Sequence, residues 1–223
     1  MKNILIVFFL VLSQITFAQF TIKTEDFNVV KIFDNLQVKL IPSSENKIVI
    51  FGNRKMEVEI LNKKGVLKLK MPNPILKSLS GDNITINLFY KNIQSIQASE
   101  GSYVFSDAIF KQNAINLNAT SGAEINLNLD VDRASIRAFS GGILELSGNA
   151  KNQNENIFFG GNLKASKLQT SQSKIIAYAG GKAEIYSSLY VDADAKTGGS
   201  IFIYGKPKQV NKQTILGGTI IEK

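Results

Sequence analysis

The chain has 223 residues, with 26 Lys and Arg against 18 Asp and Glu, a formal net charge of +8, and neither Cys nor His. The missing Cys excludes disulfides, and the missing Cys and His together exclude Cys- or His-ligated zinc sites, Cys nucleophiles and the Ser-His-Asp triad. The basic residues are scattered, so the surface serves solubility or attracts anionic polymers only weakly. We expect no cofactor and no nucleic-acid partner.

The first 18 residues have the features of a secretory signal peptide. Lys2 supplies positive charge, Ile4–Leu12 is an unbroken apolar run, and the sequence ending at Ala18 has the small-residue spacing of a cleavage site. The sequence predicts cleavage between Ala18 and Gln19, and a periplasmic, cell-surface or extracellular mature chain. A retained anchor is the weaker alternative, because the apolar run is about half of the roughly 20 residues that span a bilayer. No later segment is long enough to cross a membrane as a helix.

The segment 27–96 is rich in β-formers without a regular repeat. Apolar or alternating runs predict strands at 29–33, 36–41, 47–51, 58–61, 66–70 and 84–90. Turn-forming residues separate these runs, and a loop is expected from Pro72 to Asn83. We interpret 27–96 as irregular coils and hairpins that cap the amino-terminal end of the core, because an open end would expose a sheet edge.

A glycine-containing phrase recurs seven times in the segment 97–223. Its lead glycines stand 21, 19, 19, 20, 18 and 19 residues apart: Gly101, Gly122, Gly141, Gly160, Gly180, Gly198 and Gly217. Self-similarity with a period near 20 residues is typical of a solenoid. The glycines fit corners whose backbone angles other residues rarely adopt.

Equivalent positions around these glycines keep the same character. The third residue after each lead glycine is apolar: Val104, Ile125, Leu144, Leu163, Ala183, Ile201 and Ile220. The third residue before it is usually small: Ala98, Ala119, Ala138, Ile157, Ala177, Ala195 and Thr214. Polar and apolar residues alternate with the period of two that belongs to strands.

The repeat therefore predicts one all-β domain over 19–223, a parallel β-helix or solenoid with two short strands per period separated by a glycine turn. Stacked units would share one core, with equivalent side chains about 4.8 Å apart. A right-handed coil is the default expectation. The alternative, an antiparallel sandwich, does not explain why equivalent positions keep their character.

Two columns of the predicted stack are candidate ligand-binding sites. Phe139, Phe158 and Tyr178 each stand two residues before a lead glycine, where they form either an exposed platform for sugar rings or a buried aromatic stack. The second column contains charged residues on successive coils: Glu145, Lys164 and Glu184. It is either a binding line for a polar polymer or a solvated ladder of alternating charge.

Asp130 and Asp132, next to Arg133, are the one acidic pair that invites a catalytic hypothesis. Glycoside hydrolysis needs two carboxyl groups flanking one bond, and the two aspartates are expected on the same strand face. An Asp-x-Asp pair is more typical of a turn or of a loose cation site. We therefore expect no catalytic residues and no specific metal site.

The sequence resembles the auto-transporter adhesin "head GIN" family, whose function is not established. The likeness rests on Phe27–Val30 leading into Leu36–Ile41, on the glycine phrases from Gly101 to Gly218, and on the closing Ile201–Pro207. The resemblance covers nearly the whole mature chain and implies a right-handed parallel β-helix. It also implies an adhesive or surface-binding role, and it supplies no catalytic residues.

Three functional hypotheses remain open at this stage. The first is an exported, non-catalytic adhesion or glycan-binding module, whose partner is a polysaccharide or another anionic surface polymer. The second is a polysaccharide lyase or hydrolase on a β-helix scaffold. The third is a purely structural envelope protein, and the sequence leaves the oligomeric state undetermined.

Overall fold

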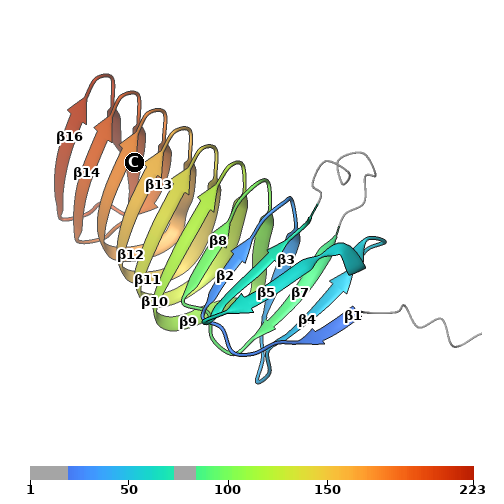
Figure 1. Cartoon of the computed structure of the whole chain (residues 1–223). Helices are drawn as coiled ribbons and strands as arrows, with labels where there is room; N and C mark the ends of the chain where they lie inside the picture. The colour runs from blue at the N-terminus through green and yellow to red at the C-terminus, as the bar shows by residue number, and fades with distance from the viewer. Residues whose placement is uncertain (1–19, 73–83) are drawn as a thin grey trace, which may run out of the picture.

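The computed structural model describes residues 20–72 and 84–223, which form one coiled sheet (Figure 1). From β9 onward the chain winds through stacked coils, and every coil pairs in parallel with the one before it. The predicted all-β parallel solenoid is therefore confirmed. Its strands are β8 (Ser95–Ala98), β9 (Tyr103–Thr120), β10 (Glu124–Phe139), β11 (Ile143–Phe158), β12 (Asn162–Tyr178), β13 (Lys182–Tyr186), β14 (Tyr190–Lys196), β15 (Ser200–Tyr204), β16 (Gln209–Ile215) and β17 (Thr219–Glu222).

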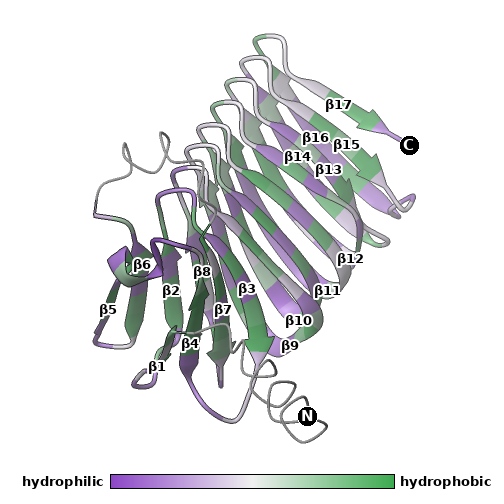
Figure 2. Ribbon diagram, turned by 90° about the vertical axis from the view of Figure 1, so that its right-hand side faces the viewer, coloured by the Kyte–Doolittle hydropathy of each residue, from purple (hydrophilic) through white to green (hydrophobic). Residues whose placement is uncertain are grey.

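The predicted columns are continuous files of side chains through the stack. The apolar column from Val104 to Ile220 is in register from coil to coil, and all but Ile220 are buried. The column from Ala98 to Thr214 is likewise in register, and only Thr214 is exposed. Apolar and polar residues alternate along the strands, as Figure 2 shows. The alternate side chains thus build one core along the axis.

The expectation of two short strands per period is wrong for β9 to β12. Each of these is one long strand that runs from one glycine turn to the next and bends in the middle. In β10 the bend falls at Asp132 and Arg133, two consecutive residues that face outward between buried Val131 and Ala134. No tight turn is needed there, so the sequence gives no turn signal. Two strands per coil appear later, where β13 and β14, and then β15 and β16, are separate.

Each glycine phrase forms a tight turn with two consecutive left-handed residues. At Ser121 and Gly122 the φ angles are 52° and 72°, and the Ala123 N–H donates to the Thr120 carbonyl across 3.1 Å. Positive φ at both central positions defines a type I′ turn. The lead glycine is therefore required for its left-handed backbone angles, as predicted.

The second glycine of a phrase has a different purpose. The φ of Gly161 is outside the left-handed region, but a Cβ there would lie 2.5 Å from the Ala138 carbonyl oxygen of the preceding coil. A Cβ at Gly142 would collide in the same way with the Ala119 carbonyl oxygen. Glycine is thus required because adjacent coils approach too closely for a side chain.

The amino-terminal part contains the six strands expected between residues 29 and 90, and β1, which was not expected. A 3₁₀ turn, Lys55–Glu57, precedes β5. The strands are β1 (Phe20–Lys23), β2 (Val29–Ile32), β3 (Gln37–Pro42), β4 (Lys47–Phe51), β5 (Glu59–Lys63), β6 (Val66–Lys70) and β7 (Thr85–Tyr90).

These strands close one end of the stack in an order that differs from the chain order. β2 lies between β6 and β8, and β3 lies between β7 and β9, all in parallel. Outside them, β5 pairs with β6, β4 with β7 and β1 with β4, each antiparallel. The antiparallel strands cover the edge that parallel stacking would leave open, as Figure 1 shows.

The repeat begins earlier than its glycines reveal. Asp34 and Asn35 have φ angles of 59° and 53°, and the Asn35 N–H donates to the Glu100 carbonyl across 2.7 Å. Val38, three residues after Asn35, is the register partner of Val104. Asn35 thus occupies the place of a lead glycine, since Asn tolerates the left-handed region better than most residues do.

Two expectations concern residues outside the described part of the chain. The predicted signal peptide with its cleavage site between Ala18 and Gln19 belongs to 1–19, and most of the loop expected from Pro72 to Asn83 belongs to 73–83.

Candidate functional site

Aromatic side chains gather at the glycine corner of three successive coils. Phe139, Phe158 and Tyr178 are register partners at the ends of β10, β11 and β12, so the predicted alignment is present. The side chains of Phe139 and Tyr178 are 37% and 38% exposed, and Phe158 is half-buried. The structure therefore places this column at the surface and not in a buried corner.

A fourth ring joins this column from the turn itself. Phe159 is 50% exposed, and its ring centroid lies 5.0 Å from that of Phe139 and 5.7 Å from that of Tyr178, both edge to face. Phe158 and Tyr178 meet at 6.1 Å in the same way. We name Phe139, Phe158, Phe159 and Tyr178 the aromatic ridge.

Sequence reasoning missed Phe159, although a signal was present. The residue just before each lead glycine is Glu100, Ser121, Ser140, Phe159, Ala179, Thr197 or Leu216. Phe159 is the aromatic exception in this column, and its φ of 50° is unusual for a bulky residue. Comparison of this column with the adjacent column, which contains the other three rings, would have placed Phe159 next to them.

The charged column lies on the opposite side of the glycine turn. Glu145, Lys164 and Glu184 are register partners on β11, β12 and β13. The Lys164 ammonium is 3.7 Å from the Glu145 carboxylate, whereas Glu184 pairs at 3.2 Å with Lys182 of its own strand. The alternating ladder is thus interrupted after one coil-to-coil pair, and such exposed pairs contribute little to stability.

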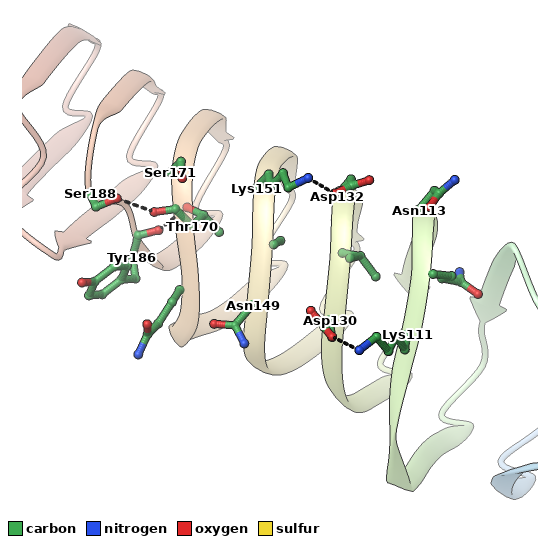
Figure 3. Close-up of a pocket in the computed structure, with 14 residues that line it drawn as sticks. Lys111, Asn113, Asp130, Asp132, Asn149, Lys151, Thr170, Ser171, Tyr186 and Ser188 are labelled. Carbon is green, nitrogen blue, oxygen red and sulfur yellow. Dashed lines mark hydrogen bonds and ion pairs between the residues drawn. The ribbon is translucent and has the colours of Figure 1, made fainter.

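A polar groove crosses the bends of the long strands, with a volume of about 820 Å³ (Figure 3). Its floor is a column of register partners in β9 to β12: Gln112, Val131, Ala150 and Thr170. One rim consists of Lys111, Asp130, Asn149 and Gln169, and the other of Asn113, Asp132, Lys151 and Ser171. Tyr186 and Ser188 lie at one end. We name these residues together the polar groove.

The acidic pair lies in the polar groove, with its carboxylates on different rims. The Lys111 ammonium is 3.3 Å from the Asp130 carboxylate, and the Lys151 ammonium is 2.5 Å from the Asp132 carboxylate (Figure 3). Arg133 is exposed and does not line the groove. Among residues 20–72 and 84–223, no three His, Cys, Asp or Glu side chains lie close enough together to hold a metal ion. Each aspartate is therefore engaged by a lysine of a neighbouring coil.

One carboxyl group lies inside the core, where sequence reasoning did not expect it. Glu155 is fully buried, with Ile136 and Ile175 as register partners. Burial raises the pKa of its carboxyl well above the ordinary value, and the Ser173 hydroxyl, 3.0 Å away, offsets only part of the effect. The alternation rule marks position 155 as inward-facing, so the signal was available.

Both surfaces belong to the segment that matches a known family. A family model described as "Putative auto-transporter adhesin, head GIN domain" matches residues 26–207. The chain belongs to this family. Its head GIN domain thus includes the aromatic ridge and the polar groove, and the resemblance inferred from the sequence is confirmed.

Solved structures share the fold of this head GIN domain over 92% of the chain. A "putative adhesin" from Bacteroides fragilis has a TM-score of 0.79 at 16% identity, with 96% of its own chain covered. A "putative adhesin" from Parabacteroides distasonis has a TM-score of 0.72 at 17% identity, again with 96% covered. A "putative lipid binding protein" from the same organism has a TM-score of 0.70 at 15% identity, also with 96% covered. Identities this low establish the fold alone.

Two further findings describe the head GIN domain. Curated proteins include none that matches its sequence. Within the described ranges, the chain has no helix with the length and apolar character that a membrane span requires.

Proposed function

We propose that the protein is an exported, non-catalytic adhesion module that binds a glycan at the cell surface or outside the cell. The observation that carries the proposal is the aromatic ridge, because four rings from three coils meet at one corner and stay partly exposed. Membership of an adhesin-described family and the predicted signal peptide support the same role.

The chemistry of the aromatic ridge suits a sugar ligand. Exposed apolar side chains that gather in one patch often mark an interaction site, and aromatic faces pack against the C–H faces of sugar rings. Successive coils present the rings at intervals of about 4.8 Å along a rigid axis. Weak contacts at each coil can therefore add along one extended partner.

The charged column is the weaker candidate within the same proposal. Glu145 and Lys164 already satisfy each other, and Glu184 is paired with Lys182. A ligand would have to displace these ion pairs to bind there. We assign Glu145, Lys164 and Glu184 a contribution to solubility, with contact to an anionic surface polymer as a secondary role.

The two alternative functions have less support. A lyase or hydrolase would need Asp130 and Asp132 to act on one bond, and each of them is ion-paired on its own rim. A purely structural envelope protein would leave the aromatic ridge without a ligand and would show stable self-association.

A glycan array together with pull-down of whole cells tests the proposal. Phe159→Ala combined with Tyr178→Ala should weaken binding at least tenfold, because half of the ridge is removed. Ala179 holds the turn position equivalent to Phe159, so the fold tolerates alanine there. The matched control is Leu216→Ala, at the same turn position, where the side chain is 78% exposed outside the ridge.

Either of two results would reject the aromatic ridge as the binding surface. One is unchanged binding by the double variant. The other is a folded wild-type protein that binds neither glycans nor cells, which would favour the structural role.

A further inference from the structure

We propose that the polar groove is a second binding site, for an uncharged linear oligosaccharide that lies along the solenoid axis. The site is separate from the aromatic ridge. Within β10, Val131 on the groove floor and Phe139 on the ridge are eight residues apart, up to about 26 Å along an extended strand. Variants at one site can therefore leave the other intact.

The charges that line the polar groove cancel, which selects against a charged ligand. Lys111 and Lys151 oppose Asp130 and Asp132, and each pair is already in contact. An anionic polymer would have to displace the carboxylates from the lysines. A hydroxyl-rich neutral ligand can leave both pairs in place, because each ammonium and each carboxylate retains further hydrogen-bonding positions.

Amide side chains of the rims have unused hydrogen-bonding capacity. Within the described part of the chain, Asn113, Asn149 and Gln169 make no side-chain hydrogen bond, although all three line the groove. An amide offers one acceptor and two donor hydrogens, which complement a sugar hydroxyl that both donates and accepts. These amides are the groups that we expect to recognise the ligand.

Hydrogen bonds between coils hold the end of the polar groove where Tyr186 and Ser188 lie. The Thr170 hydroxyl donates to the Tyr186 carbonyl across 2.5 Å, and the Ser188 hydroxyl donates to the Thr170 carbonyl across 3.2 Å. The Tyr186 ring lies so close to Gly205 that a Cβ there would be 2.8 Å from the ring. This end of the groove is therefore held by contacts with neighbouring coils, so little order is lost there when a ligand binds.

The length of the polar groove and the pairing of the strands that line it also fit an oligosaccharide ligand. Five successive coils line the groove, from β9 to the segment around Tyr186 and Ser188, so it spans four intervals of about 4.8 Å, roughly 19 Å, which suits a few sugar units. A peptide that added as a strand would need an open sheet edge. β10 and β11 have a paired strand on each side, so their backbone offers no such edge.

Isothermal titration with defined hexasaccharides tests this proposal on the mature protein. The neutral probes are cellohexaose, xylohexaose, mannohexaose, maltohexaose and chitohexaose, and the anionic probe is hexagalacturonate. At least one neutral probe should bind, and Asn149→Ala with Gln169→Ala should weaken it at least tenfold. The matched control replaces Asn152 and Gln172, which are exposed register partners on the same two strands outside the groove.

Two further variants separate the groove from the ridge and test its charge balance. Phe159→Ala with Tyr178→Ala should leave intact the share of neutral hexasaccharide binding that Asn149→Ala with Gln169→Ala removes, so failure of the ridge proposal would be seen independently. Asp130→Asn with Asp132→Asn leaves Lys111 and Lys151 unopposed, so affinity for hexagalacturonate should rise at least tenfold.

Several outcomes would overturn the proposal. These are no binding of any neutral probe, equal weakening by the control pair, or preference of the wild type for hexagalacturonate. Release of shorter sugars that stops in the Asp130→Asn, Asp132→Asn variant would replace binding with catalysis.

Discussion

Glu155 shows how one residue can make the stability of this protein depend on pH. Because burial raises its pKa, the native state keeps the carboxyl protonated, while the unfolded chain releases the proton above its ordinary value of 4.5. Unfolding then releases a proton, so rising pH favours unfolding. The stabilisation is fully present below pH 4.5 and is lost as the pH rises toward the native-state pKa.

We predict that Glu155→Gln removes this loss, because the amide keeps the shape and carries no titrating proton. Relative to the variant, the wild-type free energy of unfolding should fall by up to about 1.4 kcal/mol per pH unit above pH 4.5. Denaturant titrations between pH 4 and pH 8 measure the difference. Ser173→Ala is the control, since it removes the hydroxyl bonded to Glu155 and keeps the carboxyl. Parallel stability profiles for wild type and Glu155→Gln would contradict the assignment.

Some individual residues were predictable from the sequence, and others were not. The register of Phe139, Phe158 and Tyr178 follows from their constant distance to the glycines. Their exposure could not be predicted. Alternation with a period of two shows which side of the strand a side chain faces, but not how deeply it is buried at a corner. The ion pairs of Asp130 and Asp132 were not predicted, because each joins residues about 19 positions apart in the sequence. The bends on which these residues lie have no turn-forming sequence that would mark them.

At the scale of the strand and turn, the two glycines of a phrase are required for two different physical reasons. Gly160 needs its φ of 72°, and a Cβ added there would meet no atom within 4 Å, whereas Gly161 needs empty space beside Ala138. We predict that Gly160→Ala costs about 1 kcal/mol, the penalty of a left-handed alanine. Gly161→Ala should cost several times more, because backbone atoms of the preceding coil must move.

Thermal and denaturant unfolding of the two glycine variants measures this difference. Gly160→Asn adds a useful comparison, since asparagine tolerates the left-handed region and should lie near the wild type. Equal destabilisation by Gly160→Ala and Gly161→Ala would show that close approach between coils is not what selects the second glycine.

Most elements could be predicted, because strand periodicity and turn residues are local properties. The strands between residues 29 and 90 follow their apolar runs closely. β1 was missed because Phe20–Lys23 is short and gains its order from antiparallel pairing with β4. The turn at Asp34 and Asn35 was missed because the repeat was recognised by its glycines, and here Asn35 stands in the place of the lead glycine.

At the scale of the whole molecule, the two ends of the described stack differ. Antiparallel strands cover the amino-terminal end, whereas β16 and β17 each have one parallel neighbour, β14 and β15. Most residues from Gln209 to Lys223 are exposed. Local stability should therefore decrease from the middle of the stack toward β17, since each coil is stabilised mainly by its neighbours.

We predict that hydrogen exchange follows this gradient. Amides of β16 and β17 should exchange first, and those of β10 and β11, which are paired on both sides, should exchange last. Mass spectrometry of peptides from the native protein measures the order. Uniform protection across all coils would indicate that the stack opens only as a single unit.

The solenoid as a whole was predictable, because the same local pattern of residues recurs in every repeat. The order of the amino-terminal strands was not, since β6 and β7 insert beside β2 and β3 through contacts between distant segments. No periodic pattern in the sequence reports such an insertion.

A stack of coils responds to mechanical load in a particular way. Tension applied at the carboxyl-terminal end would peel the outermost coil first, because each coil is bonded only to its neighbours. Every detached coil adds about 19 residues, roughly 65 Å of slack chain, as the glycine spacing dictates. A ligand bound at the middle coils would therefore stay attached during a sudden pull while the loaded carboxyl-terminal end lengthens coil by coil.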